Sequence, residues 1–433
     1  VGNQTIAGTP KFNNLIVACT GRVLTLLNDV DITNNFQVIT GVARLDILTM
    51  QITNSTNVGT FTIENGVVVY ITGANNFPKN FANYLLDLTS TCDYRGDSDQ
   101  IIGAGIQVKY GNLTLTNSNI KTLGGDVEIL GNLTCNTATL DVSTNNYSIS
   151  LQGAWNNNNA LGGTFIPRNG EVLFTRNGNQ NINISDNATN PFYSVTLTKA
   201  SGTLLAPNNK NLLIAGNLTT IDGIYSANGK ITTVGGDLFA VNGWFANSGS
   251  FVLNKPSGLV KIKTNYDKYT NVKQINNLTI SGNASYTLYS DLAAYGDFNL
   301  SAGSFNSNGY TVALADNLAD LISISGTYSM GEGGKLLIAN GASLVVNSGG
   351  TIEIVGTAVN NAIVNNNTFY AGRYGFVVNG TIKANYYQFN NLNSNGVVVS
   401  EFATIDNTDN FSNGLFNNGA ANGIFLHIQN SQS

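Results

Sequence analysis

Short runs of alternating apolar and polar residues fill most of the chain, and Gly or Asn separates one run from the next. The clearest example is residues 333–356, GGKLLIANGASLVVNSGGTIEIVG, which divide into three blocks of eight. Each block holds two apolar residues at a spacing of two, which places both on one side of a strand. These pairs are Leu336 with Ile338, Leu344 with Val346, and Ile352 with Ile354. Gly and Asn at the block boundaries accept positive φ, so the stretch predicts three strands and three corners of one triangular coil.

A period of roughly 20 residues runs through the chain. Gly111 and Gly131 both open GNLT, and Gly216 and Gly236 open GNLTT and GDLFA at the same distance. Leucine-rich repeats share this period but need a fixed Leu ladder, whereas Val, Ile, Leu, Phe and Tyr exchange freely here. The expected fold is therefore all-β, a parallel, right-handed β-helix solenoid with coils of about 20–24 residues. Corner Asn side chains are expected to stack into amide ladders, each bonding to its copy about 4.8 Å away.

Longer units overlie this period. The skeleton that begins GNQTIAG recurs, and its copies can be aligned on Val17, Leu115, Leu197 and Ile280. The aligned positions follow one another at intervals of roughly 80 to 100 residues. We therefore expect residues 1–317 to form a β-helix repeat region of about four long units. Residues 318–433 are expected to continue the coils, either in the same array or as a distinct C-terminal segment.

The main alternative fold is a row of antiparallel β-sandwich domains of about 85 residues. Its hairpin turns would be the Asn-Gly pairs at Asn65, Asn169, Asn177, Asn228 and Asn308. The drift in unit length argues for a solenoid, which absorbs extra residues as corner insertions.

Composition excludes several functional classes. The 433 residues include 47 Gly, are 42% hydrophobic and only 10% charged, so a packed β-rich core is expected. A net charge of −5 offers no basic face for nucleic acid. No apolar run approaches the roughly 18 residues of a membrane-spanning helix, so no membrane span is expected. The exception to the acidic balance is a lysine group, expected on a solvated strand edge and loop, at Lys261, Lys263, Lys268 and Lys273.

The three cysteines, Cys19, Cys92 and Cys135, are too few and too scattered for a disulfide scaffold or a metal site. Buried thiols are the expected state, although one pair could bridge. No cofactor is expected.

Candidate catalytic groups are sparse. Three carboxylate pairs have the i, i+2 spacing that places both groups on one strand face, and none recurs one coil later to stack beside it. They are Asp29 with Asp31, Asp97 with Asp99, and Asp126 with Glu128. The single histidine, His427, alternates with apolar residues and is expected to be an ordinary strand residue. No catalytic, cofactor-binding or metal-binding residue is predicted, and calcium binding by a carboxylate pair is unsupported.

Two short motifs have simple structural interpretations. Arg95-Gly96-Asp97 resembles the integrin-binding tripeptide of animal matrix proteins, but an exposed polar loop is the favoured interpretation. Glycosylation sequons, among them Asn112, Asn132, Asn217 and Asn277, follow from an Asn- and Thr-rich chain.

Exposed aromatic side chains could stack on sugars, and two stretches are candidates. They are NYDKYTN at 265–271, with Tyr266 and Tyr269, and NYYQF at 385–389. Most Tyr and Phe residues alternate with polar ones, which is typical of core positions.

Several motifs together suggest a family. They are GNQTIAG with FNNLIV, GNLTL, GAWNN with GGTF and GEVLF, and NGWFANSGSF. These motifs resemble the tandem repeats of very large cell-surface and secreted proteins of Bacteroidota, many of which are exported by the type IX secretion system. The resemblance implies an extracellular or cell-surface location and an adhesive or structural role, with attachment through a C-terminal sorting domain. The sequence ends in QNSQS, where no such domain is recognisable. In the family pattern Val1 stands where a strand would end, so the chain is expected to be a piece of a longer protein.

The leading hypothesis is a non-enzymatic extracellular protein, a rigid β-helical stalk or adhesin segment. Its partners would be other surface proteins or glycans, and open strand edges would allow end-to-end or lateral self-association. A polysaccharide lyase or hydrolase, or a carbohydrate-binding array, on the same scaffold is the alternative.

Overall fold

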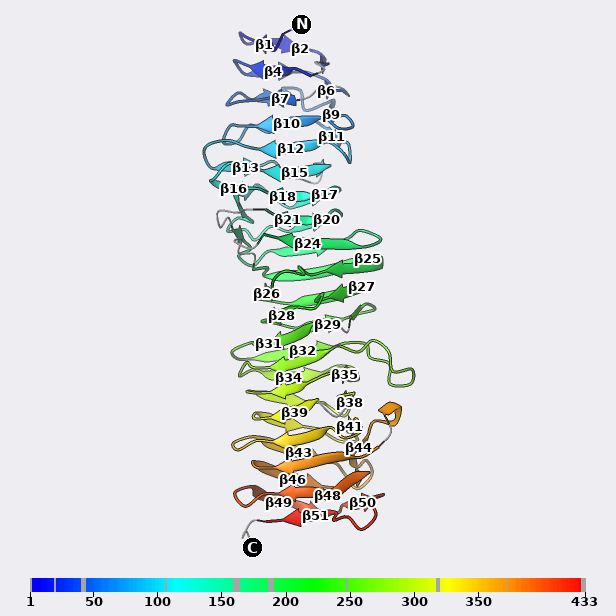
Figure 1. Cartoon of the computed structure of the whole chain (residues 1–433). Helices are drawn as coiled ribbons and strands as arrows, with labels where there is room; N and C mark the ends of the chain where they lie inside the picture. The colour runs from blue at the N-terminus through cyan, green and yellow to red at the C-terminus, as the bar shows by residue number, and fades with distance from the viewer. Residues whose placement is uncertain are drawn as a thin grey trace. The chain divides into compact units, whose positions relative to one another are not determined.

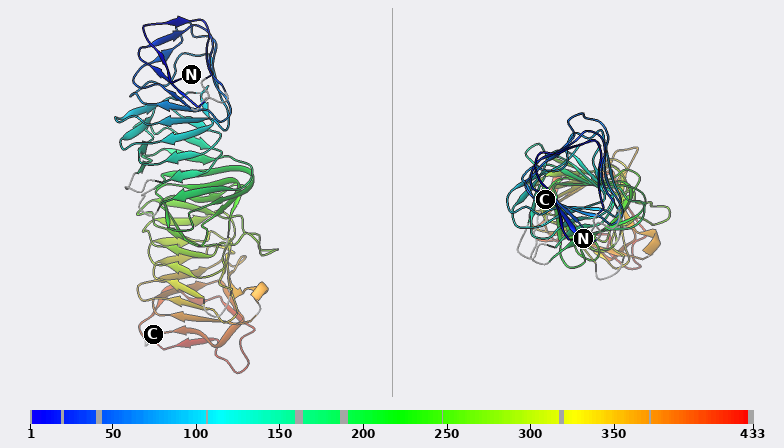
Figure 2. Two further views of the ribbon diagram at one scale, coloured as in Figure 1. Left: turned by 45° about the horizontal axis from the view of Figure 1, so that its top comes forward. Right: turned by 90° about the horizontal axis from the view of Figure 1, so that it is seen from above.

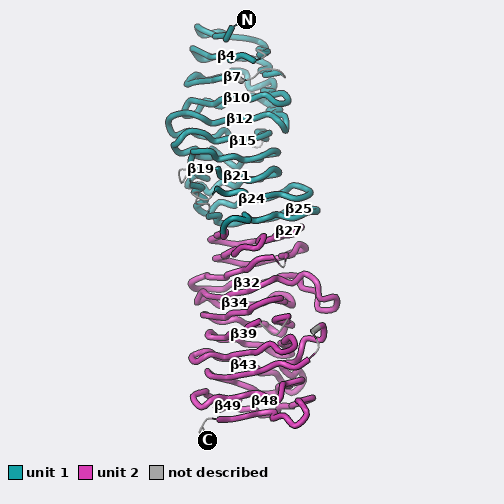
Figure 3. The backbone as a smooth tube through the Cα atoms, in the orientation of Figure 1, with its two compact units in different colours: residues 1–210 teal, residues 211–433 magenta. Residues whose placement is uncertain are grey.

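Parallel β-strands account for nearly all regular structure in this computed structural model (Figure 1). The structure describes residues 2–18, 21–39, 44–105, 107–158, 164–185, 191–246, 248–316, 320–370 and 372–429. One short 3₁₀ helix, η1 (Thr368–Tyr370), lies among them, and none of their helices has the length and apolar character to span a membrane. The chain forms two compact units, Val1–Lys210 and Asn211–Ser433 (Figure 3).

In unit 1 each coil contributes strands to three faces in turn, and viewed along the stack its first coils have a three-sided outline (Figure 2). Strands of one face pair with those of the next coil in parallel. The first face holds β1 (Gln4–Ile6), β4 (Val23–Leu26), β7 (Arg44–Asp46), β10 (Val68–Ile71), β12 (Thr91–Tyr94), β15 (Asn112–Leu115), β18 (Leu133–Cys135), β21 (Trp155–Asn157) and β24 (Gln180–Ile184). The second position of the coil holds β2 (Lys11–Phe12), β5 (Val30–Ile32) and β8 (Ile52–Thr53), then β13 (Gln100–Ile102), β16 (Ile120–Leu123), β19 (Thr139–Asp141) and β22 (Phe165–Ile166). The third position holds β3 (Leu15–Val17), β6 (Phe36–Val38), β9 (Thr60–Ile63) and β11 (Asn83–Leu86), then β14 (Lys109–Tyr110), β17 (Val127–Ile129), β20 (Ile149–Leu151), β23 (Glu171–Phe174) and β25 (Ser194–Leu205).

Unit 2 is built in the same way, with parallel pairing along each of its faces. Its first face holds β26 (Leu212–Ile214), β28 (Ile231–Val234), β31 (Ser250–Leu253), β33 (Asn277–Ile280), β36 (Phe298–Leu300), β39 (Leu321–Ile324), β42 (Ser343–Val346), β45 (Tyr374–Val378), β48 (Leu392–Val399) and β51 (Leu426–Ile428). Its second face holds β27 (Leu218–Ser226), β29 (Leu238–Ala240), β30 (Trp244–Phe245), β32 (Leu259–Lys263), β34 (Ser285–Leu288), β37 (Ser304–Asn306), β40 (Thr327–Ser329), β43 (Thr351–Val355), β46 (Thr381–Asn385) and β49 (Thr404–Ser412). Its third face holds β35 (Leu292–Ala294), β38 (Thr311–Leu314), β41 (Lys335–Ile338), β44 (Ala362–Asn366), β47 (Tyr387–Asn390) and β50 (Leu415–Asn417).

The three-block stretch at 333–356 forms the predicted coil. Its blocks are β41, β42 and β43, one on each face of unit 2. All six apolar residues of its spacing-two pairs are fully buried. The β-helix prediction is confirmed, and the sandwich alternative is wrong, because the strand ladders of the described residues are parallel. The antiparallel pairing described is an isolated bridge between Asp267 and Val272.

Coil length varies mainly at the corners, with additional residues inserted within β48 and β49, where the pairing shifts register. The corner residues Asn112 and Asn132 lie 20 residues apart, and Asn132 lies 22 residues before Ala154 in the coil that follows. In unit 2 the paired residues Glu353 and Lys383 are 30 residues apart. The predicted coil length therefore holds for the short coils, and insertions at corners lengthen others.

The interior of each unit is a continuous apolar column. Equivalent inward residues of successive coils meet, as with Phe36 and Phe61, whose rings stack 4.9 Å apart. Cys92 and Cys135 are buried free thiols, as expected, and Cys19 lies outside the described residues. Burial raises the pKa of the Cys135 thiol to about 12, which makes it unreactive at neutral pH.

The expected boundary at 317/318 falls outside the described residues. On either side of it β36 pairs with β39, so the coils continue across this point. That residues 318–433 form a distinct C-terminal segment stays a prediction.

Candidate functional site

Asn side chains at the corners bind the backbone of the next coil. Asn112 accepts a hydrogen bond from the backbone N–H of Asn132 at 2.9 Å, and Asn132 accepts one from Ala154 at 2.8 Å. Amide-to-amide contacts also occur, as between Asn183 and Asn156 at 2.8 Å. The predicted ladder of amide groups is therefore mainly a ladder of side-chain oxygens bound to backbone N–H groups. A backbone N–H has a fixed direction, whereas a neighbouring side-chain amide can rotate away.

The sequon asparagines carry out this same task. Asn217 accepts from the N–H of Asp237 at 2.8 Å, and Asn277 from that of Asp297 at 2.9 Å. Together with Asn112 and Asn132, these side chains are part of the coil-to-coil hydrogen bonding, which gives the sequons a structural explanation.

The carboxylates of two of the pairs accept hydrogen bonds from, or form ion pairs with, residues of neighbouring coils. Asp97 accepts from the Asn117 amide at 2.8 Å, and Asp99 from the N–H of Ile120 at 3.0 Å. Asp126 accepts from the N–H of Ser148 at 2.7 Å. Each carboxylate therefore receives its hydrogen bond from a coil 20 to 22 residues later.

Glu128, the partner of Asp126, forms an ion pair with Lys109 at 2.9 Å. The two acidic residues line an open depression of about 420 Å³ that also includes Lys109 and Ser150. A second depression of about 400 Å³ follows the corner of Asn112 and Asn132. Asp126, Glu128, Asn112 and Asn132, which line them, are engaged in structural contacts.

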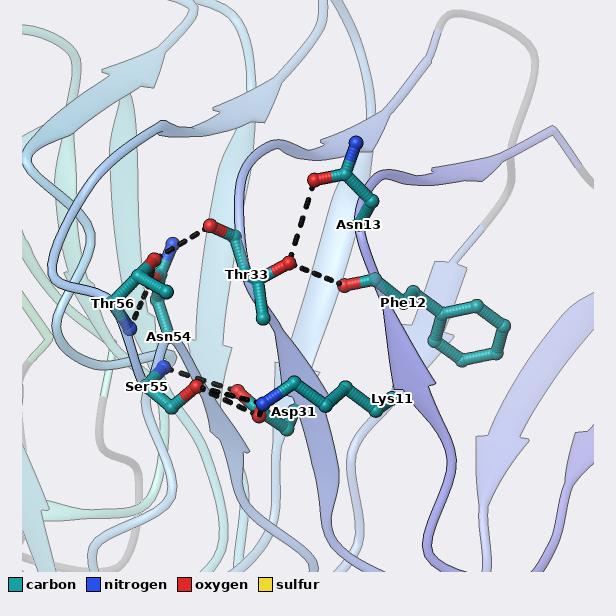
Figure 4. Close-up of polar contacts among 8 residues, drawn as sticks. All are labelled: Lys11, Phe12, Asn13, Asp31, Thr33, Asn54, Ser55 and Thr56. Carbon is teal, nitrogen blue, oxygen red and sulfur yellow. Dashed lines mark hydrogen bonds and ion pairs between the residues drawn. The ribbon is translucent and has the colours of Figure 1, made fainter.

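In the third pair, Asp31 lies in a polar cluster formed by β2, β5 and the turn after β8 (Figure 4), and Asp29 lies just before β5. Asp31 is 2.9 Å from the Lys11 ammonium and accepts from the Ser55 hydroxyl at 2.8 Å, while Asp29 accepts from the N–H of Gln51 at 2.9 Å. Hydrogen bonds from Lys11 and Ser55 lower the pKa of Asp31. Lys11 also donates to the Ser55 oxygen at 3.4 Å. A serine nucleophile needs a neighbouring base that takes up its proton. The group that accepts the Ser55 hydrogen bond is Asp31, and its lowered pKa makes it a weak base, so the cluster does not resemble an activated serine.

Arg95-Gly96-Asp97 is a coil corner. Gly96 is buried, and a Cβ there would lie 2.3 Å from the carbonyl oxygen of Thr72. The Arg95 guanidinium lies over the Tyr70 ring at 4.1 Å. Because its Gly is buried and both its charged side chains are engaged, the tripeptide does not have the projecting form that integrin recognition would require. His427, in β51, pairs with Val398 of β48 and is exposed, so its expected strand role is confirmed.

Two buried lysines were not predicted. Lys121 donates to the carbonyl of Gly96 at 2.9 Å, and Lys199 donates to that of Arg176 at 2.7 Å. Burial lowers the pKa of each ammonium to about 8. Both lie over a corner that a buried glutamine closes, Gln100 or Gln180.

The two corners share a buried glutamine, which in the Gly178-Asn179-Gln180 copy belongs to the recurring skeleton, whereas Gln100 follows Asp99 and the skeleton's Gln4 is exposed. Gln100 donates to the carbonyls of Ile71 and Gly73, and Gln180 donates to those of Leu151 and Gly153. Each glutamine therefore binds the preceding coil through two hydrogen bonds, and each lysine supplies a donor from the coil that follows.

The candidate aromatic stretches divide between core and surface. Tyr266 is 6% exposed, whereas Tyr269 is 83% exposed. In NYYQF, Tyr387 and Phe389 are buried core residues. Tyr266, Tyr387 and Phe389 are therefore wrong as ligand platforms, Tyr386 is half-buried, and Tyr269 is the most accessible ring of the two stretches.

Tyr266 anchors an insertion between β32 and β33. Its ring packs on Ala293 and Ala313, outward residues of β35 and β38, with Leu337 beside them. Its hydroxyl donates to Asn271 at 2.9 Å, within the same insertion. The insertion, residues 264–276, projects beyond β32 in Figure 1.

The lysine group surrounds this insertion together with four rings, of which Tyr269 and Tyr289 are exposed and Phe239 and Trp244 are half-buried. Lys261 and Lys263 lie in β32, which pairs with both β29 and β34, so the expected strand edge is wrong; a solenoid pairs its inner strands on both sides. Lys268 and Lys273 lie in the insertion, as expected. Each ammonium lies 5.3–5.8 Å from a ring centroid: Lys261 from Tyr289, Lys263 from Phe239, Lys268 from Tyr269, and Lys273 from Trp244.

These eight residues form what we call the basic–aromatic surface of unit 2. It is the one place among the described residues where the candidate sugar-stacking aromatics and the lysine group coincide. The described residues also contain no group of three or more His, Cys, Asp or Glu that could hold a metal ion.

Comparisons with protein-family models, with curated proteins and with solved structures gave no match.

Proposed function

We propose that the chain is a non-enzymatic, extracellular adhesive scaffold, a β-solenoid whose side surface attaches it to other molecules. The supporting observation is the use of its polar side chains. The carboxylates of the three candidate pairs bind the backbone, an amide, a hydroxyl or an ammonium of another coil. Such groups stabilise stacking and are poorly placed to exchange protons with a substrate.

The location rests on the resemblance to surface and secreted repeat proteins of Bacteroidota, and the role on the scaffold. Stacked coils share one core and are joined by backbone hydrogen bonds along their length, which makes a stiff support for a binding surface. An enzyme on this scaffold would instead need groups free for substrate, and the depression beside Asp126 and Glu128 is where they would be sought.

Retention and turnover on one glycan panel test the proposal. The chain is immobilised and exposed to acidic and neutral polysaccharides, and both bound polymer and released sugar are measured. We expect binding to at least one polymer with no release of unsaturated or reducing products. Product release that Glu128→Gln abolishes would establish the lyase or hydrolase instead. Failure to retain any polymer would contradict the adhesive role towards glycans.

A further inference from the structure

The basic–aromatic surface is built on a regular row of outward side chains. Phe239 pairs in register with Lys263, and Tyr289 follows Leu288, the partner of Ile262. The rings of Phe239 and Tyr289 lie 6.4 Å apart. Their neighbours along the chain, Leu238, Ile262 and Leu288, are fully buried. Because side chains alternate along a strand, Phe239, Lys263 and Tyr289 point outward.

The insertion extends this row. Trp244 lies just beyond the corner after β29, and Lys273 from the insertion is 5.3 Å from its ring centroid. The Asn265 amide donates to the carbonyls of Val241 and Gly243, which ties the insertion to that corner. The row and the insertion therefore form one continuous surface.

Positive charge prevails on this surface although the chain as a whole is acidic. Of its four lysines only Lys268 has an ion-pair partner in the described part of the chain, Asp291 at 3.0 Å. The other nearby carboxylates accept backbone hydrogen bonds, Asp237 from Lys261 at 2.8 Å and Asp267 from Tyr269 at 2.9 Å. Four lysines and three aspartates give this surface a net charge of +1 in a chain whose net charge is −5, and the Lys263 ammonium also donates to the carbonyl of Val241 at 3.3 Å.

Rings and ammonium groups side by side match one ligand chemistry. An aromatic face packs on the apolar face of a sugar ring, and an ammonium pairs with a carboxylate on that ring. Nucleic acid fits less well, because it needs many phosphate contacts and this surface offers only four lysines.

We infer that the basic–aromatic surface binds an acidic, carboxylate-bearing polysaccharide, with Lys263 and Lys273 pairing with carboxylates and Tyr269 packing on a sugar ring. The inference rests on the proposed adhesive function and names its ligand. Binding should be electrostatic in part and therefore weaken as salt rises.

Polygalacturonate and its fully methyl-esterified form, which lacks the carboxylates, are the matched probes. The whole chain is compared with the double variant Lys263→Gln/Lys273→Gln and with Tyr269→Ala. Lys11→Gln/Lys109→Gln removes equal charge from unit 1, and Phe402→Ala removes a ring that is 87% exposed. Circular dichroism confirms that each variant is folded.

We expect the double lysine variant to bind polygalacturonate about fivefold or more weakly and Tyr269→Ala about threefold more weakly, with both controls within twofold of the parent chain. Equal affinity for the esterified polymer, equal losses in the controls, or tighter binding of a single-stranded DNA oligonucleotide would each overturn the inference. In those cases retention on some polymer of the panel still supports the adhesive function; absence of retention on every polymer rejects both.

Discussion

Asparagine has two roles at the corners of this solenoid, and both follow from its short polar side chain. It accepts left-handed backbone angles, as Asn146 does at φ 60° and Asn308 at 52°. It also presents an oxygen to the N–H of the next coil, as Asn112 and Asn132 do. The abundance of Asn is therefore explained by geometry at the corners.

Replacement of Asn132 tests the second role. Asn132→Ala leaves the N–H of Ala154 without its 2.8 Å acceptor, and we expect a loss of about 1–2 kcal/mol in the free energy of unfolding. Asn132→Asp keeps an oxygen in place and should cost less. Urea denaturation of the two variants measures the difference, and equal losses would show that the oxygen is not what matters.

The buried lysines give the stability a pH dependence. Burial lowers the pKa of Lys121 and of Lys199 to about 8 in the folded chain, from 10.5 for an exposed lysine. Well below pH 8 the two lysines are protonated in both the folded and the unfolded chain, so the folded state bears the full cost of burying their charge. As pH rises further the folded state loses its lysine protons first, so each lysine should add roughly 2 kcal/mol of stability up to about pH 9.5. The buried thiols Cys92 and Cys135 oppose part of this rise from about pH 9, because burial raises the pKa of each and they ionise first in the unfolded chain.

At still higher pH the trend should reverse. Burial raises the pKa of Tyr225, so its phenol stays neutral in the fold while it ionises in the unfolded chain above pH 10. Urea midpoints between pH 7 and 9.5 check the rise. Lys121→Met/Lys199→Met should flatten it and the exposed Lys335→Met should not; an unchanged slope in the double variant would refute the assignment.

Individual surface residues were the hardest to predict from sequence. The lysine group and Tyr269 were singled out by composition and motif, but their coincidence on one surface depends on pairing of β29, β32 and β34. Tyr266 has the same sequence context as Tyr269, and only its contacts with Ala293 and Ala313 make it a core residue.

At the level of strands and corners, the sequence was sufficient. Two apolar residues at a spacing of two specify which side chains enter the core, and Gly or Asn specifies where the chain bends. Both signals are local, which is why β41, β42 and β43 match their predicted blocks. The longer units are less informative, since the aligned residues Val17 and Leu115 lie on different faces, in β3 and β15.

The insertion after β32 is an element whose attachment can be tested. Tyr266→Ala removes the ring that packs on Ala293 and Ala313, so the insertion should detach while the coils stay folded. We expect faster proteolysis within residues 264–276 and little change in the unfolding midpoint. Tyr266→Phe keeps the packing and should retain protection, as should Tyr269→Ala. Unfolding of neighbouring coils in Tyr266→Ala would show that the insertion is integral to the core.

Across the whole molecule, the strand pairing of the described residues joins each coil to the coils before and after it, so stability should be largely a local property. Leu133 is fully buried and pairs with Leu113 and Trp155. Leu133→Ala should cost about 2–4 kcal/mol locally and accelerate hydrogen exchange in β15, β18 and β21. Amides of β42 in unit 2 should be unaffected.

Leu344→Ala in β42 is the reciprocal variant, with its effect confined to β39, β42 and β45. Uniform acceleration throughout the chain in either variant would instead indicate one cooperative unit.

The parallel pairing of inner strands with two neighbours has a consequence for a chain that meets proteases. A cut in the exposed turn at residues 144–146 would leave the strands on both sides, β19 and β20, hydrogen-bonded to the coils before and after. The two fragments would separate on a denaturing gel yet migrate together in native buffer. A cut chain would thus stay assembled, and cleavage at a corner need not release a bound ligand.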